Sequence, residues 1–244
     1  MSFPKINLHC HSLYSDGKNS INEIVVKGIK IGLDYLAITD HFTNSWKSGL
    51  MPTLNSVEKI DNYLEEISNC QNYLKTTSKN LLLYKGIEID LGSSEQFIKH
   101  LIEPWKFDII LFEYLETLEG LAFVNNLIAY WERKRSFGTL PLFGLAHFDP
   151  SNFIYTGIDR LIQFLSKHNI FFEFNSSYSQ FYSRKYEIFF EKLKKHQIPV
   201  SIGSDAHHSK QLSLISEPYY RVKEYGLEDN LSHLLMLLKE ERNI

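Results

Sequence analysis

The segment KINLHCHSLYSDGKNSINEIVVKGIKIG, residues 5–32, contains a short apolar strand, a polar loop and an amphipathic helix in that order. We expect the helix to begin at Ser20, because Glu23 follows three residues later as in a capping box, and to end at Gly32. A strand followed by a helix is the unit from which parallel sheets are built. The same alternation continues along the chain, which predicts an α/β fold.

Apolar runs of strand length recur seven times, and most are apolar throughout, as in strands buried on both faces. The runs are Lys5–His9, Tyr35–Thr39, Leu81–Glu88, Asp108–Phe112, Phe143–His147, Phe171–Asn175 and Val200–Ser204. Amphipathic stripes over residues 54–74, 158–165 and 231–238 predict outer helices. His, Asp and Glu gather at the carboxyl ends of most strands. This favours a closed barrel, since an open sheet collects its reactive groups at one switch point.

The composition fits one globular domain and excludes several other classes. With 244 residues, 43% hydrophobic and 23% charged, the chain is expected to form a single domain over residues 1–244. A net charge of −3 provides no overall positive field for nucleic acid, so no such partner is expected. No apolar run or leader pattern suits a membrane, and we expect a cytoplasmic location. Cys10 and Cys70 form neither a disulfide framework nor a Cys-x-x-Cys zinc motif.

Imidazoles and carboxylates at the strand ends predict a metal site. His9 and His11 alternate with Cys10, so the two imidazoles share one face about 6.6 Å apart and can converge on a cation, although an isolated His-x-His fits two ordinary loop histidines equally well. Glu88 lies inside an apolar run, where a buried carboxylate needs a metal ion, a proton or a cation. Further groups at the same ends are Asp16, Asp40, His41, His147, Glu173, Asn175, Asp205 and His207. Such nitrogen and oxygen ligands suit Zn²⁺, Mn²⁺ or Fe²⁺, and their number predicts more than one ion.

Taken together, the motifs resemble those of the PHP (polymerase and histidinol phosphatase) domain family. They are His9-x-His11-Ser12, Ser15-Asp16-Gly17, Ile38-Thr39-Asp40-His41, Gly86-Ile87-Glu88, Gly144-x-x-His147-x-Asp149, Glu173-x-Asn175 and Gly203-Ser204-Asp205-Ala206-His207. The resemblance covers nearly the whole chain in the right order. It implies a distorted (β/α)7 TIM-like barrel with two or three divalent metal ions (Zn, Mn or Fe) at its carboxyl-terminal face.

The resemblance also implies a role for each ligand. A first metal would be held by His9, His11, Glu88 and Asp205, a second by Glu88 and His147, and a third by Asp16, His41 and His207. Asp40 would orient an imidazole of the third site, as carboxylates beside metal-bound histidines do. The chain departs from the family after the fourth strand, where a Gly-Ser-x-His motif is common but Phe112-Glu113-Tyr114-Leu115-Glu116 stands. Glu113 or Glu116 could replace this histidine, or the second site could be weak, exchangeable or absent.

Such a centre predicts a metal-dependent phosphoesterase that hydrolyses a small phosphate monoester by attack of metal-activated water. Its catalytic groups would be Glu88, Asp205, His207 and Asp40, and Arg184 is the first candidate for binding the phosphate. An exposed arginine at a helix start explains Arg184 equally well. The segments around residues 144–149, 173–177 and 202–207 look most like the histidinol-phosphatase branch, so histidinol phosphate is one expected substrate.

Other interpretations stay open at this point. Tyr178, Phe181 and Tyr182 could wall a substrate pocket or pack in the core. A nucleotide or nucleic-acid phosphodiesterase or exonuclease would need a basic groove, but the densest basic run, Arg133–Arg135, ends a predicted helix and suits a solvated face. A non-catalytic metal-binding interaction domain is the third reading. The oligomeric state is left open.

Overall fold

Eight parallel strands form one sheet in the computed structural model of the protein, which describes residues 3–134, 139–155 and 157–240. The strands are β1 (Ile6–Asn7), β2 (Tyr35–Ile38), β3 (His41–Phe42), β4 (Leu82–Asp90), β5 (Ile109–Glu113), β6 (Leu142–Leu145), β7 (Phe171–Asn175) and β8 (Val200–Gly203). Their order is β1-β2-β4-β5-β6-β7-β8, with the short β3 paired to β4. All seven expected strands are confirmed, and β3 is an additional piece that follows β2.

Hydrogen bonds between β1 and β8 bring the two ends of the sheet together. The amide of Leu8 donates to the carbonyl of Ile202 at 2.9 Å, and the amide of His11 donates to Ala206 at 2.9 Å. Cys10 and Ala206 form a parallel bridge beyond the two strands. The sheet is therefore nearly closed into the expected barrel.

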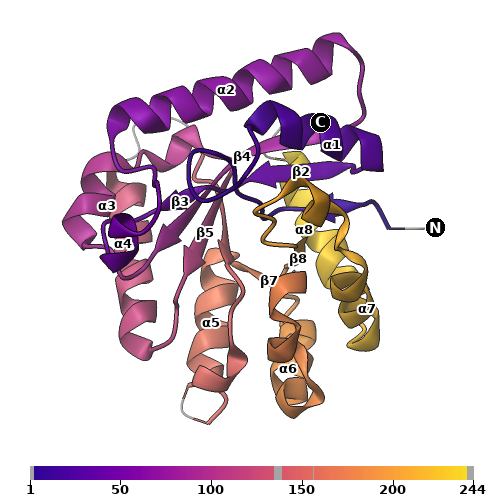
Figure 1. Cartoon of the computed structure of the whole chain (residues 1–244). Helices are drawn as coiled ribbons and strands as arrows, with labels where there is room; N and C mark the ends of the chain where they lie inside the picture. Colours follow the sequence, from indigo (N-terminus) through magenta and orange to yellow (C-terminus); the bar gives the residue numbers. More distant parts are fainter. Residues whose placement is uncertain (1–2, 135–138, 156, 241–244) are drawn as a thin grey trace.

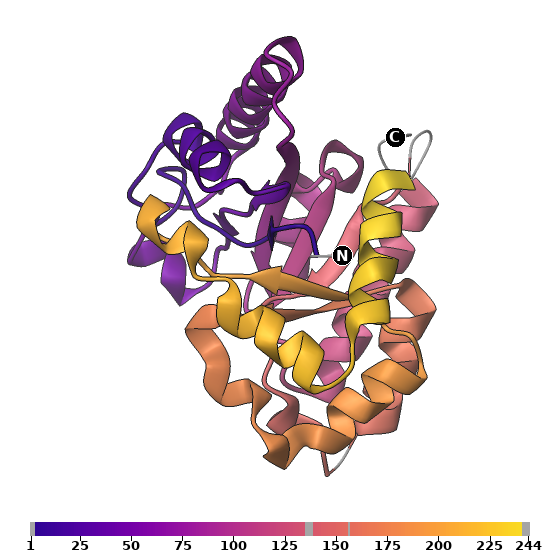
Figure 2. The same ribbon diagram turned by 90° about the vertical axis from the view of Figure 1, so that its right-hand side faces the viewer.

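The helices lie on the outer side of the strands in both views of the molecule (Figures 1 and 2). They are α1 (Ile21–Ile31), α2 (Val57–Thr76), α3 (Glu95–Leu101), α4 (Leu118–Lys134), α5 (Ile158–His168), α6 (Glu187–Lys195), α7 (Ser216–Glu224) and α8 (Glu228–Glu240). Short 3-10 turns are η1 (Trp46–Gly49), η2 (Pro104–Lys106), η3 (Pro150–Asn152), η4 (Ser176–Tyr182), η5 (Arg184–Tyr186) and η6 (Ser209–Ser213). Over the residues that the structure describes, no helix combines the length and apolar character needed to cross a membrane. Of the basic run, Arg133 and Lys134 end α4, whereas Arg135 lies outside the described residues.

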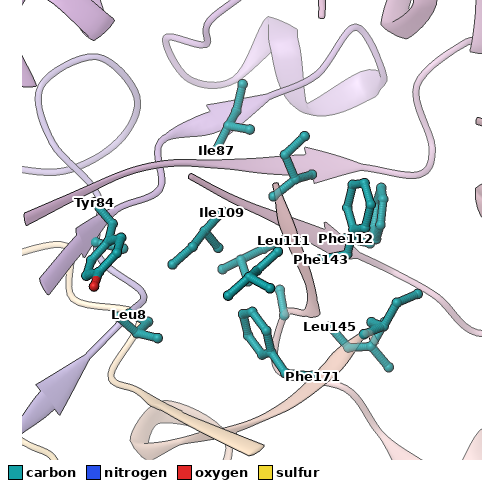
Figure 3. Close-up of a cluster of buried hydrophobic side chains, with 14 of the residues drawn as sticks. Leu8, Tyr84, Ile87, Ile109, Leu111, Phe112, Phe143, Leu145 and Phe171 are labelled. Carbon is teal, nitrogen blue, oxygen red and sulfur yellow. The ribbon is translucent and has the colours of Figure 1, made fainter. Parts of the chain in front are cut away.

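The register of the strands determines which side chains enter the barrel. Leu111 on β5 pairs with Gly144 on β6, and Gly144 pairs with Phe171 on β7. Paired residues point to the same side of a sheet, so these positions share the interior. Phe112 and Phe143 point outward, where the Phe143 ring stacks on Trp131 of α4. Figure 3 shows Leu111 and Phe171 approaching each other in this packing.

Candidate metal centre

Strand alternation brings the predicted ligands into the barrel at the carboxyl ends of the strands. Glu88 on β4 pairs with Leu111, so its carboxylate lies on the interior side with the apolar layer below it. Glu113 ends β5 on the same face, two residues beyond Leu111. Glu88, His9 and His11 are almost completely buried. The expectation that Glu88 is a buried carboxylate is confirmed.

Within the described part of the chain, the ligand atoms form overlapping groups. Each of the following groups has ligand atoms within 4.8 Å of one another: His11, Asp16, His41 and His207; His9, Glu88 and His147; His9, His11 and Asp205; and His41, Glu88 and Glu113. We call these nine residues the histidine–carboxylate cluster. It contains all eight residues predicted as metal ligands, and Glu113 is the ninth member.

Glu88 lies between two sides of the cluster. Its Oε1 lies 3.4 Å from His9 Nε2 and 3.2 Å from His147 Nε2. Its Oε2 lies 3.6 Å from His11 Nε2 and 2.8 Å from His41 Nδ1. Each carboxylate oxygen thus faces two imidazoles, which is the arrangement expected of a bridging ligand.

Asp205 and Asp16 face imidazoles on the other sides. Asp205 Oδ1 lies 2.9 Å from His11 Nε2 and 3.5 Å from His9 Nε2. Asp16 Oδ2 lies 2.9 Å from His207 Nε2, and its Oδ1 lies 3.8 Å from His11 Nδ1. The ring of His11 stacks on that of His207 with centroids 4.5 Å apart. Residues separated by almost two hundred positions therefore share one site.

The polar atoms of the cluster fit divalent cations. His9 Nε2 and His11 Nε2 face each other at 3.1 Å. Both oxygens of Glu88 and the Oδ1 of Asp16 are buried without a hydrogen bond of acceptable geometry, in spite of the short approach of His41 to Glu88. Buried polar atoms require a partner, and imidazole with carboxylate is a donor set that Zn²⁺, Mn²⁺ and Fe²⁺ accept.

The charges of the cluster depend on one another. Burial lowers the pKa of the His41 imidazole, but the nearby carboxylates, chiefly Glu88, together outweigh burial and raise this pKa to about 9. Burial also lowers the pKa of His9, and Glu173 and Glu88 together raise it well above its ordinary value. Burial raises the pKa of Glu88, but His41 and His9 hold it well below the usual range. Glu88 is therefore an ionised carboxylate that is stabilised by positive charge around it.

A family model for the PHP domain matches residues 7–225. The chain belongs to the PHP domain family. Over 89 residues it is 35% identical to the DNA polymerase/3'-5' exonuclease PolX of Bacillus subtilis, a match that covers 36% of this chain and only 14% of that polymerase.

Solved structures share the barrel of this PHP domain at low sequence identity. A putative histidinol phosphatase, HisK, from Listeria monocytogenes has a TM-score of 0.61 and 15% identity, over 86% of this chain and 97% of that one. The histidinol phosphate phosphatase of Lactococcus lactis, complexed with Zn, L-histidinol and phosphate, has a TM-score of 0.59 and 16% identity, over 92% and 95%. A chain from the metal-dependent tyrosine phosphatases YwqE of Bacillus subtilis and CpsB of Streptococcus pneumoniae has a TM-score of 0.59 and 20% identity, over 97% and 94%. These structural similarities show that the chain shares the fold of these proteins.

Glu173 is a supporting residue of this PHP domain and was not among the predicted ligands. Its Oε1 lies 2.9 Å from His9 Nδ1, and its Oε2 accepts hydrogen bonds from the backbone amide of His147 and from Asn175 Nδ2. A carboxylate behind an imidazole fixes the ring and its tautomer. The Glu173-x-Asn175 motif was the available signal, because two polar residues alternate there on the inner face of an apolar strand.

Asp40, which was predicted to orient an imidazole, has two serines as its direct side-chain partners. Asp40 accepts hydrogen bonds from the amide of Ser12 at 2.8 Å, from Ser12 Oγ at 2.6 Å and from Ser15 Oγ at 2.5 Å. Asp40 and His41 are adjacent, and neighbouring side chains in an extended segment point to opposite faces. Asp40 therefore anchors the loop after β1 and reaches the cluster only through Ser15, whose Oγ lies 3.4 Å from His11 Nδ1.

Glu113, the last residue of β5, lies in the segment where the chain departs from the family pattern. Glu113 is buried, with Oε1 3.6 Å from His147 Nε2 and Oε2 3.9 Å from His41 Nδ1. Leu115 is buried, whereas Glu116 is exposed beside a neighbouring cavity. Of the two glutamates considered in the sequence, Glu113 is the one that lies in the cluster. Its partner is Lys47 of η1, whose Nζ lies 2.6 Å from both carboxylate oxygens.

Two adjoining cavities open onto the cluster. A cavity of about 250 Å³ is lined by Asp16, His41, Lys47, Glu113, Asp205 and His207 among others. A second cavity of about 160 Å³ is lined by Glu116, Asp149 and Phe181, and Tyr114, His147 and Tyr178 line both. The Tyr178 ring stacks on His147 with centroids 4.3 Å apart. Tyr178 and Phe181 thus line a pocket as one reading expected, while Tyr182 is buried and binds the amide of Asn175.

Arg184 is not brought to the cluster. It lies on η5 and lines neither cavity. Its side chain is 78% exposed, with Nε 3.5 Å from Glu224 of α7. The sequence places Arg184 shortly after β7, but the η4 turn leads the chain outward before it. Lys47 is the cation that the structure brings to the cavity wall, and no motif in the sequence marked it.

Proposed function

We propose that the chain is a metal-dependent phosphoesterase that hydrolyses a small phosphate monoester. The observation that carries this proposal is the position of Glu88, whose two buried oxygens face four imidazoles beside a cavity that His41 and His147 line. Similar barrels belong to phosphatases of histidinol phosphate and of tyrosine phosphate. The phosphate monoester is the chemistry that these proteins share.

The cluster offers ligands for two or three divalent ions. The ligands proposed are His9, His11, Asp16, His41, Glu88, His147, Asp205 and His207, with Glu88 bridging. Bound in such a site, divalent ions activate water and neutralise the charge of a phosphate. Glu173 holds the His9 ring from behind, and Asp40 keeps the loop that carries Asp16 in place through its three hydrogen bonds.

The cavities suggest where the substrate lies. We place the phosphate in the larger cavity, where Asp205 and His207 reach the wall, and the leaving group in the smaller one. Tyr178 and Phe181 supply an aromatic surface to the smaller cavity, and Glu116 and Asp149 supply negative charge. This combination suits an aromatic leaving group that carries a cationic amine. Histidinol phosphate has both features and is the substrate that we propose.

Metal content and phosphate release test the phosphoesterase. Protein purified without chelator is assayed for metal per chain, and for phosphate release with Zn²⁺, Mn²⁺ or Fe²⁺. The substrates are histidinol phosphate, phosphotyrosine, nucleotides, bis-p-nitrophenyl phosphate and single-stranded DNA. We expect bound metal and turnover of monoesters, with histidinol phosphate fastest. Metal binding without turnover of any substrate would favour a non-catalytic metal-binding domain, and cleavage of DNA or the diester alone would favour a phosphodiesterase or exonuclease.

A variant of the pocket tests the substrate. Glu116→Gln removes one negative charge from the leaving-group cavity, so KM for histidinol phosphate is expected to rise several-fold while KM for p-nitrophenyl phosphate stays unchanged. Glu119→Gln removes an exposed charge on α4 and serves as the matched control. An equal KM for histidinol phosphate in the two variants would contradict the proposed position of the amine.

A further inference from the structure

Glu113 has a cationic partner supplied by the chain itself. The Nζ of Lys47 lies 2.6 Å from both oxygens of Glu113, and both side chains are largely buried. An ammonium that contacts both oxygens neutralises the charge of the carboxylate without any metal ion. In this one corner of the histidine–carboxylate cluster, the positive charge therefore comes from a lysine.

The loop that carries Lys47 is anchored to the barrel. Ser45, which caps η1, donates a hydrogen bond to Asp90 Oδ2 at 2.5 Å, and Thr43 donates to the same oxygen at 2.8 Å. Asp90 ends β4, the strand that carries Glu88. The Lys47 ammonium also lies over the Tyr114 ring, 4.3 Å from its centroid. Lys47 is thus fixed from two sides.

Glu113 could hold a divalent ion if Lys47 were neutral. Glu113, Glu88 and His41 present ligand atoms within 4.8 Å of one another, and His147 Nε2 is 3.6 Å from Glu113 Oε1. With Lys47 in place, a divalent ion on Glu113 would put two cations, with three positive charges in all, on one buried carboxylate. Burial lowers the pKa of Lys47, but Glu113 outweighs burial and raises it, so the ammonium keeps its charge.

We propose that the Lys47 ammonium is a built-in cation that takes the place of a divalent ion at Glu113. The native chain then binds metal through the rest of the cluster, and Glu113 is not a metal ligand. Since Lys47 lines the larger cavity, its charge also faces the position of the phosphate. The inference rests on the proposed metal centre and limits its ions to those that the other eight residues of the cluster hold.

Counting metal per chain tests the inference independently of activity. Each protein is equilibrated with Zn²⁺, freed of excess ion and analysed for zinc per chain, with circular dichroism to confirm folding. We expect Lys47→Met to bind one zinc ion more than the native chain, because its thioether leaves Glu113 without a cation. Lys47→Arg, which keeps the charge, is expected to bind the native number. Lys106→Met is the control, because it removes an exposed lysine paired with Asp61 and Glu103.

Glu113→Gln gives a second measurement that does not depend on the folding of Lys47→Met. If Lys47 replaces the ion, this variant keeps the native zinc content, and the double variant Lys47→Met/Glu113→Gln loses the extra ion. Loss of one zinc from Glu113→Gln, or an unchanged count in folded Lys47→Met, would overturn the inference. Those results leave the phosphoesterase intact if the native chain binds zinc and releases phosphate. A native chain that binds no metal would overturn both.

Discussion

Glu173 is the residue on which the orientation of the His9 imidazole depends. It contacts His9 Nδ1 at 2.9 Å and also accepts the amide of His147, so it links two of the proposed ligands. Carboxylates in this position raise the basicity of the ligand imidazole and fix its direction. The residue itself lies outside the groups that could hold an ion.

Glu173→Gln is therefore expected to weaken zinc affinity without removing a ligand. The amide keeps nearly the same shape but loses the charge behind His9, and such changes cost about 10- to 100-fold in metal affinity. Affinity is measured by competition with a chromogenic chelator. Glu191→Gln, an exposed change on α6, is the control. Equal affinities in the two variants would show that Glu173 does not tune the site.

Protonation of the imidazoles is expected to oppose metal binding. In the metal-free protein, His41 has a pKa of about 9 and His9 has one well above 6.5, because nearby carboxylates outweigh burial. Both carry protons at pH 7, and a bound metal must displace these protons. Calorimetric titrations with Zn²⁺ in buffers of different ionisation enthalpy are expected to show proton release, and affinity should rise from pH 6 to about pH 9. Equal heats in all buffers would contradict this.

The same shift has a consequence for stability. The pKa of His41 is raised from 6.5 to about 9 on folding. The contribution of His41 to the free energy of unfolding of the metal-free protein is therefore fully present below pH 6.5. That contribution is lost as the pH rises through about 9.

At the scale of elements, α1 shows how completely local sequence can determine a helix. Ser20 accepts a hydrogen bond from the amide of Glu23, and the Glu23 side chain accepts one from the amide of Ser20. Gly32 ends the helix at φ 71° and ψ 43°, in the left-handed region. Both ends agree with the expectation, because every group involved lies within the helix or beside it.

Gly32→Ala is expected to destabilise the protein by about 1–2 kcal/mol, the cost of a left-handed conformation for a residue with a Cβ. Space is not the cause, because the added Cβ would meet Lys5 Nζ at 3.9 Å, an ordinary contact distance, and no closer atom. Urea unfolding measures the change. Gly49→Ala is the matched control, since its Cβ would meet nothing within 4 Å. A loss as large in Gly49→Ala would rule out the conformational explanation.

The bounds of other helices depend on residues outside the periodic pattern and on tertiary packing. The apolar stripe predicted a helix from residue 54, but α2 begins at Val57 because Ser56 caps it and accepts the amide of Lys59. Leu54 is buried outside the helix, with its amide bonded to the carbonyl of His41. The short helices α3, α6 and α7 were not predicted. Segments of seven to nine residues give too little periodicity and are stabilised mainly by packing.

At the scale of the whole molecule, the barrel interior places a glycine beside a large aromatic side chain. Gly144 on β6 lies beside Phe171 on β7, and a Cβ at Gly144 would lie 2.2 Å from an atom of the Phe171 ring. The ring therefore fills the space that the glycine leaves. This layer lies below the residues of the histidine–carboxylate cluster on the same face of the sheet.

Gly144→Ala is expected to destabilise the barrel by about 1–3 kcal/mol, as overpacking of a core does. Phe171→Leu replaces the ring with a smaller side chain, so the double variant should be more stable than the sum of the two single changes predicts. Urea unfolding of the three variants measures the coupling. Strict additivity would mean that Gly144 is required for some reason other than the ring of Phe171.

The sequence by itself determined the alternation of strands and helices, both ends of α1, and the eight proposed ligands as polar residues at strand ends. These features follow from patterns within a few residues of one another. Only the tertiary structure decided that Glu113 lies in the cluster, that Lys47 reaches it, and that Glu173 orients His9. Arg184 and Asp40 show the converse, because proximity along the chain did not place them as expected. Contacts across strands depend on register and barrel closure, which local patterns do not encode.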